Sequence, residues 1–143
     1  MSNQAILFPM FGLAVWTALV LLLIPVARFL AVSRGEVTVA DFKLGESSAV
    51  PYAVSIPNRN YMNLLEAPVL FYVVCLILYV SATSSISATY LAWVYVALRV
   101  VHSAIHLTYN NVIHRMSAFA ASNAVLVALW VLAGLTLYSL AGA

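Results

Sequence analysis

Residues 6–27 read ILFPMFGLAVWTALVLLLIPVA, and no charged side chain interrupts this run before Arg28. A helix needs about 20 mainly apolar residues to cross a bilayer, so the run is long enough to span one. A cleavable signal peptide would start with basic residues and have a shorter apolar core, whereas the preceding MSNQA carries no basic side chain. We therefore expect a retained transmembrane helix over about 6–28.

Three further apolar runs follow, over about 61–82, 86–109 and 118–140. The composition agrees with them, because 65% of the 143 residues are hydrophobic and only 7% are charged, whereas soluble domains carry about 25% charged residues. A chain of this length cannot bury so much apolar surface in one small core. The sequence contains no internal repeat and no soluble domain, so we expect an all-α integral membrane four-helix bundle that forms one domain, 1–143.

The basic residues indicate how such a bundle is oriented. Four spans place both termini and the Ser/Thr-rich turn at 81–89 on one side, with the polar stretch 31–58 and the connection 110–117 on the other. Cytoplasmic loops carry the excess of Lys and Arg, so we expect 31–58 and 110–117 in the cytoplasm and both termini outside, in a multi-pass protein of the cell (inner) membrane. The basic residues on the second side are Arg28, Arg34, Lys43, Arg59 and Arg115.

Polar residues at helical spacing mark a candidate site within the second and third spans. An ionisable residue inside a span costs roughly 2.5–3.5 kcal/mol on insertion scales, which makes it a functional candidate by default. Spacings of three and four place residues on one helical face, and both rows lie toward the cytoplasmic ends, so we expect the rows to face each other. The rows are Arg59, Asn63 and Glu66 on the second span and Arg99, His102, His106 and Asn110 on the third, with Arg115 just beyond it.

A structural interpretation of these residues stays open beside a functional one. Glu66 and Arg99 would then form an ion pair that fixes the register of the helices, and His102 and His106 would be hydrogen-bonded core residues. Two histidines four residues apart need further ligands to hold a metal, and no cysteine or carboxylate accompanies them on that span, so we expect no bound metal. The six basic residues form no dense patch, so we expect no nucleic-acid partner.

The two polar rows resemble the motifs of the MAPEG family (membrane-associated proteins in eicosanoid and glutathione metabolism). These motifs are R-x-x-x-N-x-x-E on the second span and R-x-x-H with a distal arginine on the third. The length, the four spans and the external termini agree as well, so the resemblance extends over essentially the whole chain and favours a prokaryotic member. The matching residues are Arg59, Asn63 and Glu66 within NRNYMNLLEAPVLFY (58–72), and Arg99, His102 and Arg115 within RVVHSAIHLTYNNVIHR (99–115).

The resemblance implies a homotrimer with glutathione sites between neighbouring protomers. It also implies a glutathione-dependent transferase or peroxidase-type enzyme that acts on lipophilic substrates, with membrane lipid and a lipophilic small molecule as partners. Glutathione would be the co-substrate, Arg115 would be the catalytic residue that stabilises its thiolate, and Arg99 would serve packing and charge balance. The implied glutathione-binding residues are Arg28, Arg59, Asn63, Glu66, His102 and His106.

The sequence departs from the family pattern at three positions, and two other functions stay open. Met62 replaces an arginine that often precedes the motif asparagine, and His106 stands where some members have a tyrosine. Phe119 lacks a hydroxyl that some members place near the sulfur. The family includes non-catalytic members, so a trimeric thiol- or lipid-binding membrane protein is one alternative. A small proton-coupled exporter is another, although such exporters carry their membrane glutamate in the first helix and have short loops throughout.

Overall fold

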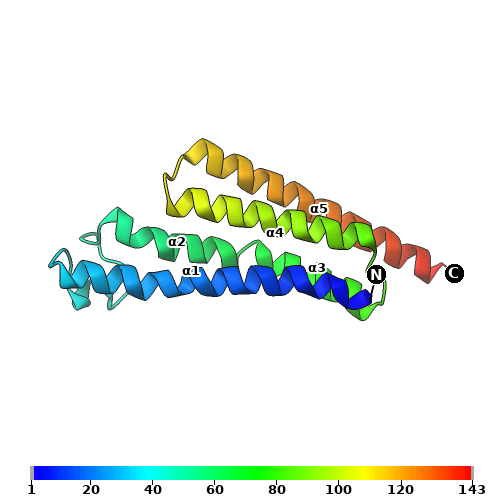
Figure 1. Cartoon of the computed structure of the whole chain (residues 1–143), viewed down its shortest axis with the longest axis horizontal. Helices are drawn as coiled ribbons and strands as arrows, with labels where there is room; N and C mark the ends of the chain where they lie inside the picture. The colour runs from blue at the N-terminus through cyan, green and yellow to red at the C-terminus, as the bar shows by residue number, and fades with distance from the viewer. Residues whose placement is uncertain (1, 143) are drawn as a thin grey trace.

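The computed structural model of the chain describes residues 2–142, and every regular element in that range is a helix (Figure 1). Four helical stretches are long and apolar enough to cross a membrane. The expected all-α, four-span membrane bundle is therefore confirmed. In chain order the elements are the 3₁₀ helix η1 (Asn3–Ile6), α1 (Leu7–Ser33), the 3₁₀ helix η2 (Val39–Phe42), α2 (Tyr52–Leu65), α3 (Pro68–Val80), α4 (Ile86–Leu107) and α5 (Val112–Ala141).

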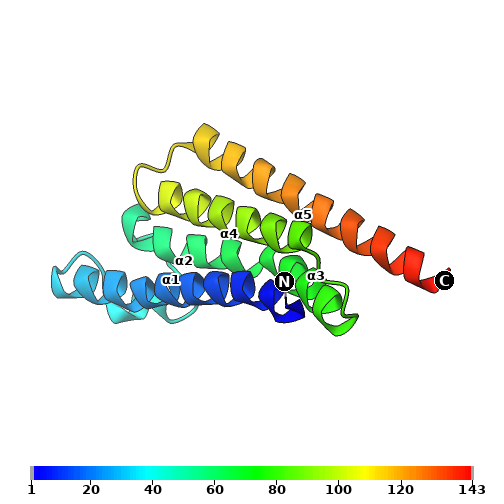
Figure 2. The same cartoon turned by 45° about the vertical axis from the view of Figure 1, so that its right-hand side comes forward.

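The helices lie side by side, with α4 in contact with α1, α2 and α5 (Figure 1). Figure 2 shows that α5 leaves the bundle toward its C-terminal end. The other helices pack closely against one another. The ring of Phe71 on α3 stacks on that of Tyr95 on α4, with the ring centroids 4.5 Å apart. Gly12 lets α1 approach Trp93, whose ring would lie only 3.3 Å from a Cβ at that position.

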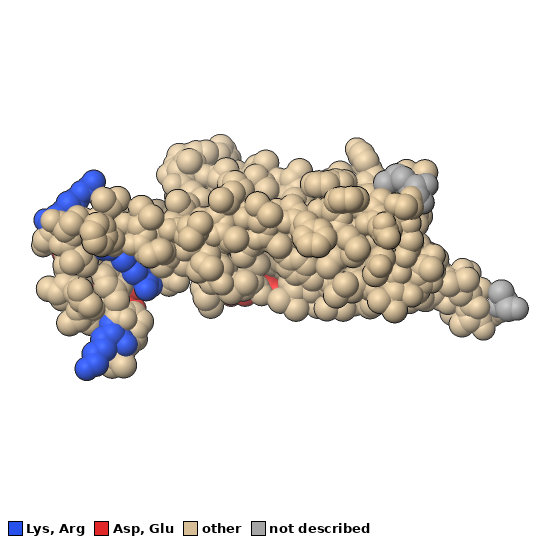
Figure 3. Space-filling view, turned by 60° about the horizontal axis from the view of Figure 1, so that its bottom comes forward, with Lys and Arg blue, Asp and Glu red and all other residues tan. Residues whose placement is uncertain are grey.

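The outer surface of the bundle is apolar, as contact with lipid requires. Large hydrophobic side chains are exposed along both outer helices, among them Phe11 and Leu22 on α1 and Val127 and Leu135 on α5. Figure 3 shows Lys and Arg side chains gathered at one end of a body that is otherwise nearly free of charge. We call this end, which carries the segment between α1 and α2, the basic end. The protein is a multi-pass membrane protein.

The second span differs from the expected 61–82. It begins at Tyr52, so residues 52–58 are helical and do not belong to the polar loop, and it is broken into α2 and α3 around Glu66. Pro68 explains the break, because a proline ring lacks the N–H donor and clashes with the carbonyl four residues earlier. Glu66 consequently has a non-helical ψ of −94°. Pro51 lies at the N-cap of α2, and Pro57 lies inside the helix.

Other helix ends also differ from the expected bounds of 6–28, 86–109 and 118–140. The first helix continues past Pro25 to Ser33, and α4 ends at Leu107. The last helix begins at Val112, because the side chain of Asn111 caps it by accepting hydrogen bonds from two backbone N–H groups of the first turn. Arg115, expected in a connection, therefore lies in the first turn of α5.

The segment between α1 and α2 is folded around Asp41. The carboxylate of Asp41 accepts hydrogen bonds from the hydroxyls of Ser47 and Thr38, each at 2.7 Å, and from the backbone N–H of Thr38 at 2.8 Å. The Ser47 bond, followed by those from Thr38, holds the pKa of Asp41 below its usual range. These contacts fix the loop that lies over Arg28 at the basic end.

Candidate functional site

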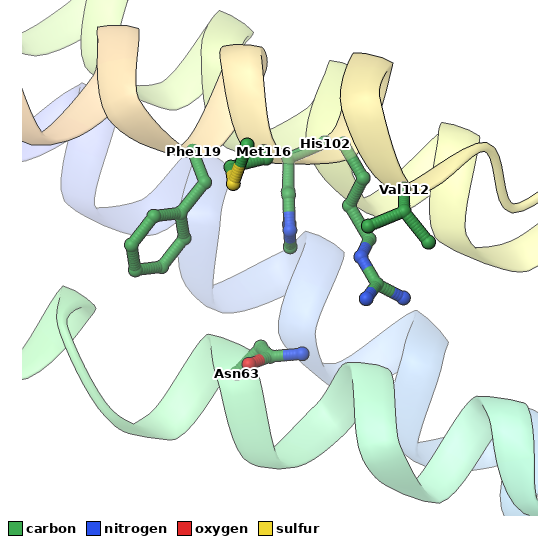
Figure 4. A pocket seen from close by; sticks show the side chains of 6 residues that line it. Asn63, His102, Val112, Met116 and Phe119 are labelled. Atoms are coloured by element: carbon green, nitrogen blue, oxygen red, sulfur yellow. The ribbon is translucent and has the colours of Figure 1, made fainter.

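A pocket of about 240 Å³ brings together three of the residues that the sequence singled out. Asn63 comes from α2, His102 from α4 and Arg115 from α5, so three helices build its polar wall. Figure 4 shows the His102 ring pointing from α4 toward Asn63 across the pocket. The remaining lining is apolar and comes from Val112, Met116 and Phe119. The polar rows of the second and third spans therefore meet at Asn63 and His102, as expected.

Arg115 is held at this pocket by the turn between α4 and α5. Its Nη1 donates a hydrogen bond to Oδ1 of Asn110 at 2.8 Å. The amide nitrogen of Asn110 in turn donates to the phenol oxygen of Tyr52 on α2, at 2.5 Å. Asn110 was expected on the polar face of the third span without a role, and Tyr52 was not expected at the site. The available signal for Asn110 was its position directly before the helix cap Asn111.

The two histidines of α4 are both buried, each with 3% of its surface exposed. Their ring centroids are 6.2 Å apart, and the ring of His102 lies 5.8 Å from that of Phe119. Nδ1 of each histidine is buried without a hydrogen-bond partner in the described chain. Among residues 2–142 no group of three or more His, Cys, Asp or Glu side chains is placed to hold a metal ion.

Arg99 is fully buried and does not pair with Glu66. Its Nε donates to the hydroxyl of Tyr95 at 3.1 Å, and its Nη2 donates to Oδ1 of Asn123 at 2.8 Å. Its guanidinium also lies over the rings of Tyr95 and Phe119, at 5.2 and 4.9 Å from their centroids. Glu66 is exposed at the helix break, and within residues 2–142 its side chain forms no ion pair. The interpretation of Glu66 and Arg99 as a register-fixing ion pair is therefore wrong for the single chain.

Arg28 and Arg59 lie outside the Asn63 pocket, at the basic end. Nη2 of Arg28 is 3.3 Å from Oε1 of Glu46, and its guanidinium lies 4.9 Å from the ring centroid of Phe42. Arg59 lines a second pocket, of about 470 Å³, under the loop that precedes α2. Its guanidinium lies 5.7 Å from the ring centroid of Tyr52. Tyr52 therefore joins the two pockets, because its ring faces Arg59 and its hydroxyl bonds the residue that holds Arg115.

Asn60 is a buried polar residue that sequence analysis missed. It is fully buried on α2, and its amide nitrogen donates to the hydroxyl of Ser103 on α4 at 2.6 Å. This bond ties α2 to the helix that carries His102. Asn60 lies three residues before Asn63 and so shares a side of the helix with it, which was the available signal.

A third depression, of about 550 Å³, lies between α3 and α5 and is almost entirely apolar. Asn123 supplies its polar side chain. Because Arg99 has donors only, it must bond the oxygen of the Asn123 amide, and the amide nitrogen is then left to donate elsewhere. The other lining residues are Ala67, Leu70, Leu126, Val127, Trp130 and Val131.

The family model of the MAPEG family matches residues 6–135, which include all four membrane spans up to the last turns of α5 and every residue of the pocket around Asn63. The chain belongs to the MAPEG family. Membership places this MAPEG protein among membrane proteins of glutathione and eicosanoid metabolism. No curated protein and no solved structure matched the chain.

Proposed function

We propose that this MAPEG protein is a glutathione-dependent transferase or peroxidase-type enzyme that acts on lipophilic substrates. The observation that supports this most is the pocket in which Asn63, His102 and Arg115 meet. These three residues come from different helices and match the family motifs in order and spacing. A pocket in which a few polar groups converge beside apolar side chains is typical of small-molecule sites between helices of a bundle.

The charges around the pocket suit glutathione. This tripeptide carries two carboxylates and one ammonium, so its site needs more cationic than anionic groups, and arginine binds carboxylates with two parallel hydrogen bonds. The thiol lies beside Arg115, and the carboxylates extend past Tyr52 toward Arg59. Arg28 exchanges Glu46 for a ligand carboxylate. Glu66 accepts from the ammonium, while Asn63, His102 and His106 complete the hydrogen bonds.

Arg115 supplies the chemistry by stabilising the thiolate. A free thiol has a pKa of about 8.5, so only a few per cent is ionised at neutral pH. A guanidinium within about 4–6 Å lowers that pKa by one or more units, and each unit raises the thiolate fraction about tenfold. The thiolate sulfur then bonds to the electrophilic atom of the substrate, and the electron pair of the broken bond stays on the departing group.

The lipophilic substrate occupies the groove between α3 and α5. Its lining is apolar and it opens on the lipid-facing surface, so a membrane-dissolved molecule reaches it without crossing water. The amide nitrogen of Asn123, turned away from Arg99, donates to an oxygen of that substrate. Asn123 lies one helical turn from Phe119, which lines the glutathione pocket, so the two sites are adjacent along α5.

Assembly as a homotrimer would cover Glu66. The single chain leaves this carboxylate exposed at the helix break of the second span, and an unpaired charge facing lipid costs roughly 2.5–3.5 kcal/mol. A neighbouring protomer or a ligand bound between protomers removes that cost. In the membrane the basic end faces the cytoplasm and both termini lie outside, in agreement with the distribution of Lys and Arg.

Non-catalytic thiol binding is the second candidate, and Phe119 favours it. Its ring lines the pocket next to His102 and carries no hydroxyl to assist the sulfur. Calorimetric titration of the purified protein with glutathione, combined with a conjugation assay on a lipophilic electrophile, separates the two. Binding with turnover supports the enzyme, binding without turnover supports the second candidate, and absence of binding contradicts both.

A further inference from the structure

The turn between α4 and α5 adopts an unusual backbone conformation at Asn110. Its φ is +47°, in the left-handed region that side chains other than glycine, asparagine and aspartate rarely adopt. The backbone N–H of Asn110 donates to the carbonyl of Ile105 at 2.8 Å and so closes the end of α4. This conformation turns the chain directly into Asn111, which caps α5.

The hydrogen bonds around Asn110 fix which way its amide faces. Arginine offers donors only, so the oxygen of the amide must face Arg115, in agreement with the 2.8 Å contact. The amide nitrogen then faces Tyr52 and donates to its hydroxyl. A flipped amide would place N–H groups against the guanidinium and lose the bond to Arg115, whereas the hydroxyl of Tyr52 can bond either end of the amide. The orientation of Asn110 is therefore determined by Arg115.

These contacts link three helices through one small side chain. Tyr52 belongs to the first turn of α2, Asn110 follows α4 and Arg115 lies in the first turn of α5. The Tyr52 ring also packs against Arg59. A half-buried arginine without such a partner samples many rotamers, and holding one of its nitrogens reduces that freedom in advance of binding.

We propose that Asn110 is a positioning residue for Arg115 and that Tyr52 anchors Asn110 from the second span. This inference rests on the proposed function for its consequence, because a fixed guanidinium stabilises a bound thiolate better than a mobile one. Whatever the protein binds, loss of the Asn110–Arg115 bond or of the Tyr52–Asn110 bond should also free Arg115.

The chain offers matched variants for the test. Asn110→Gly removes the amide and keeps a residue that accepts positive φ at no steric cost. Tyr52→Phe removes only the anchoring hydroxyl. Tyr109→Phe is the control, because it removes a phenol at the same end of the bundle that contacts His114 and not Arg115. Thermal unfolding of all three, in detergent, identifies any loss of fold.

The first readout is the rate at which an arginine-selective dicarbonyl reagent modifies Arg115 in the full-length protein, measured by peptide mass spectrometry. We expect Asn110→Gly and Tyr52→Phe to raise this rate several-fold, in line with the loss of a hydrogen bond to a charged group, and Tyr109→Phe to leave it unchanged. Equal rates in all variants would overturn the inference, whatever the function of the protein.

The second readout is the pH titration of bound glutathione thiolate by its absorbance at about 240 nm. We expect Asn110→Gly to move the titration toward that of Arg115→Ala, with no further movement when the two are combined. If Arg115→Ala moves the curve and Asn110→Gly does not, the positioning role is overturned and the proposed function stands. If the first readout responds and Arg115→Ala leaves the curve in place, the positioning is supported and the thiolate role fails.

Discussion

Arg99 donates a 2.8 Å hydrogen bond from Nη2 to Oδ1 of Asn123 and so ties α4 to α5 inside the membrane-spanning part of the bundle. Within residues 2–142, Arg99 forms no ion pair with a carboxylate. Its charge is instead accommodated by an amide, a phenol and two aromatic rings. Stacking of this kind suits the planar, weakly hydrated guanidinium better than it would suit an ammonium.

Asn123→Leu should destabilise the protein, because it removes an acceptor from a buried charge. The loss of a hydrogen bond to a charged group corresponds to about 1.5–3 kcal/mol. Thermal unfolding in detergent measures it. Thr136→Val on the same helix is the control, since the hydroxyl of Thr136 donates to the carbonyl of Leu132 within its own helix. Equal losses for the two variants would show that Asn123 has no special role in holding Arg99.

Much of the fold follows from the sequence, because apolar runs of sufficient length with few charges have few alternatives to spanning a membrane. The break around Glu66 was also encoded, in Pro68, but hydropathy does not respond to a missing N–H donor. Helical spacing correctly brought Asn63 and His102 together. It could not show that Arg59 lines a different pocket. Spacing gives the face of a helix on which a residue lies, but not which loop covers each turn of that face.

The partners of Arg28 and Arg99 could not be predicted from the sequence for a related reason. Arg28 was expected to bind a ligand carboxylate and Arg99 to pair with Glu66. In the structure Arg28 pairs with Glu46, and Arg99 donates to Asn123. Glu46 lies in the segment between α1 and α2, and Asn123 lies on α5. Which side chains these parts bring next to each arginine depends on how the chain folds in space, and residue spacing does not give that.

Lys43 should be accessible only from the cytoplasm. In a Cys75→Ala background, which removes the buried native thiol of α3, Lys43→Cys should react with a membrane-impermeant maleimide only after the cells are opened. Ser139→Cys near the other end of the bundle should react in intact cells. The reverse pattern would contradict the assignment of the basic end to the cytoplasm.

Glu66→Gln should weaken glutathione binding roughly tenfold or more, because it removes a charged acceptor for the ligand ammonium. Glu66→Leu should weaken binding as well and also shift the oligomer distribution in native mass spectrometry. Calorimetry supplies the affinities, and Glu46→Gln, which disturbs the pair with Arg28 and not the helix break, serves for comparison. Unchanged affinity in Glu66→Gln would reduce Glu66 to a structural residue.

The order of the 34–51 segment should depend on pH through Asp41. The hydrogen bonds to its carboxylate lower its pKa in the folded protein, so their contribution is full above the pKa of the unfolded chain. It is lost as the pH falls through the folded value. Asp41→Asn should therefore increase hydrogen exchange of this segment at neutral pH and match the wild type in acid. A difference that persists unchanged in acid would contradict the role of the carboxylate.

The most direct test of the glutathione-thiolate account is the pH titration of thiolate absorbance, at about 240 nm, for glutathione bound to the wild type and to Arg115→Ala. If Arg115 stabilises the thiolate, the thiol pKa of glutathione bound to the wild type should lie at least about one unit below that of free glutathione. On Arg115→Ala the thiol pKa should return toward the free value, with a smaller change in affinity. Arg115→Lys should recover part of the shift. A bound thiol that titrates on the wild type like free glutathione would contradict the account.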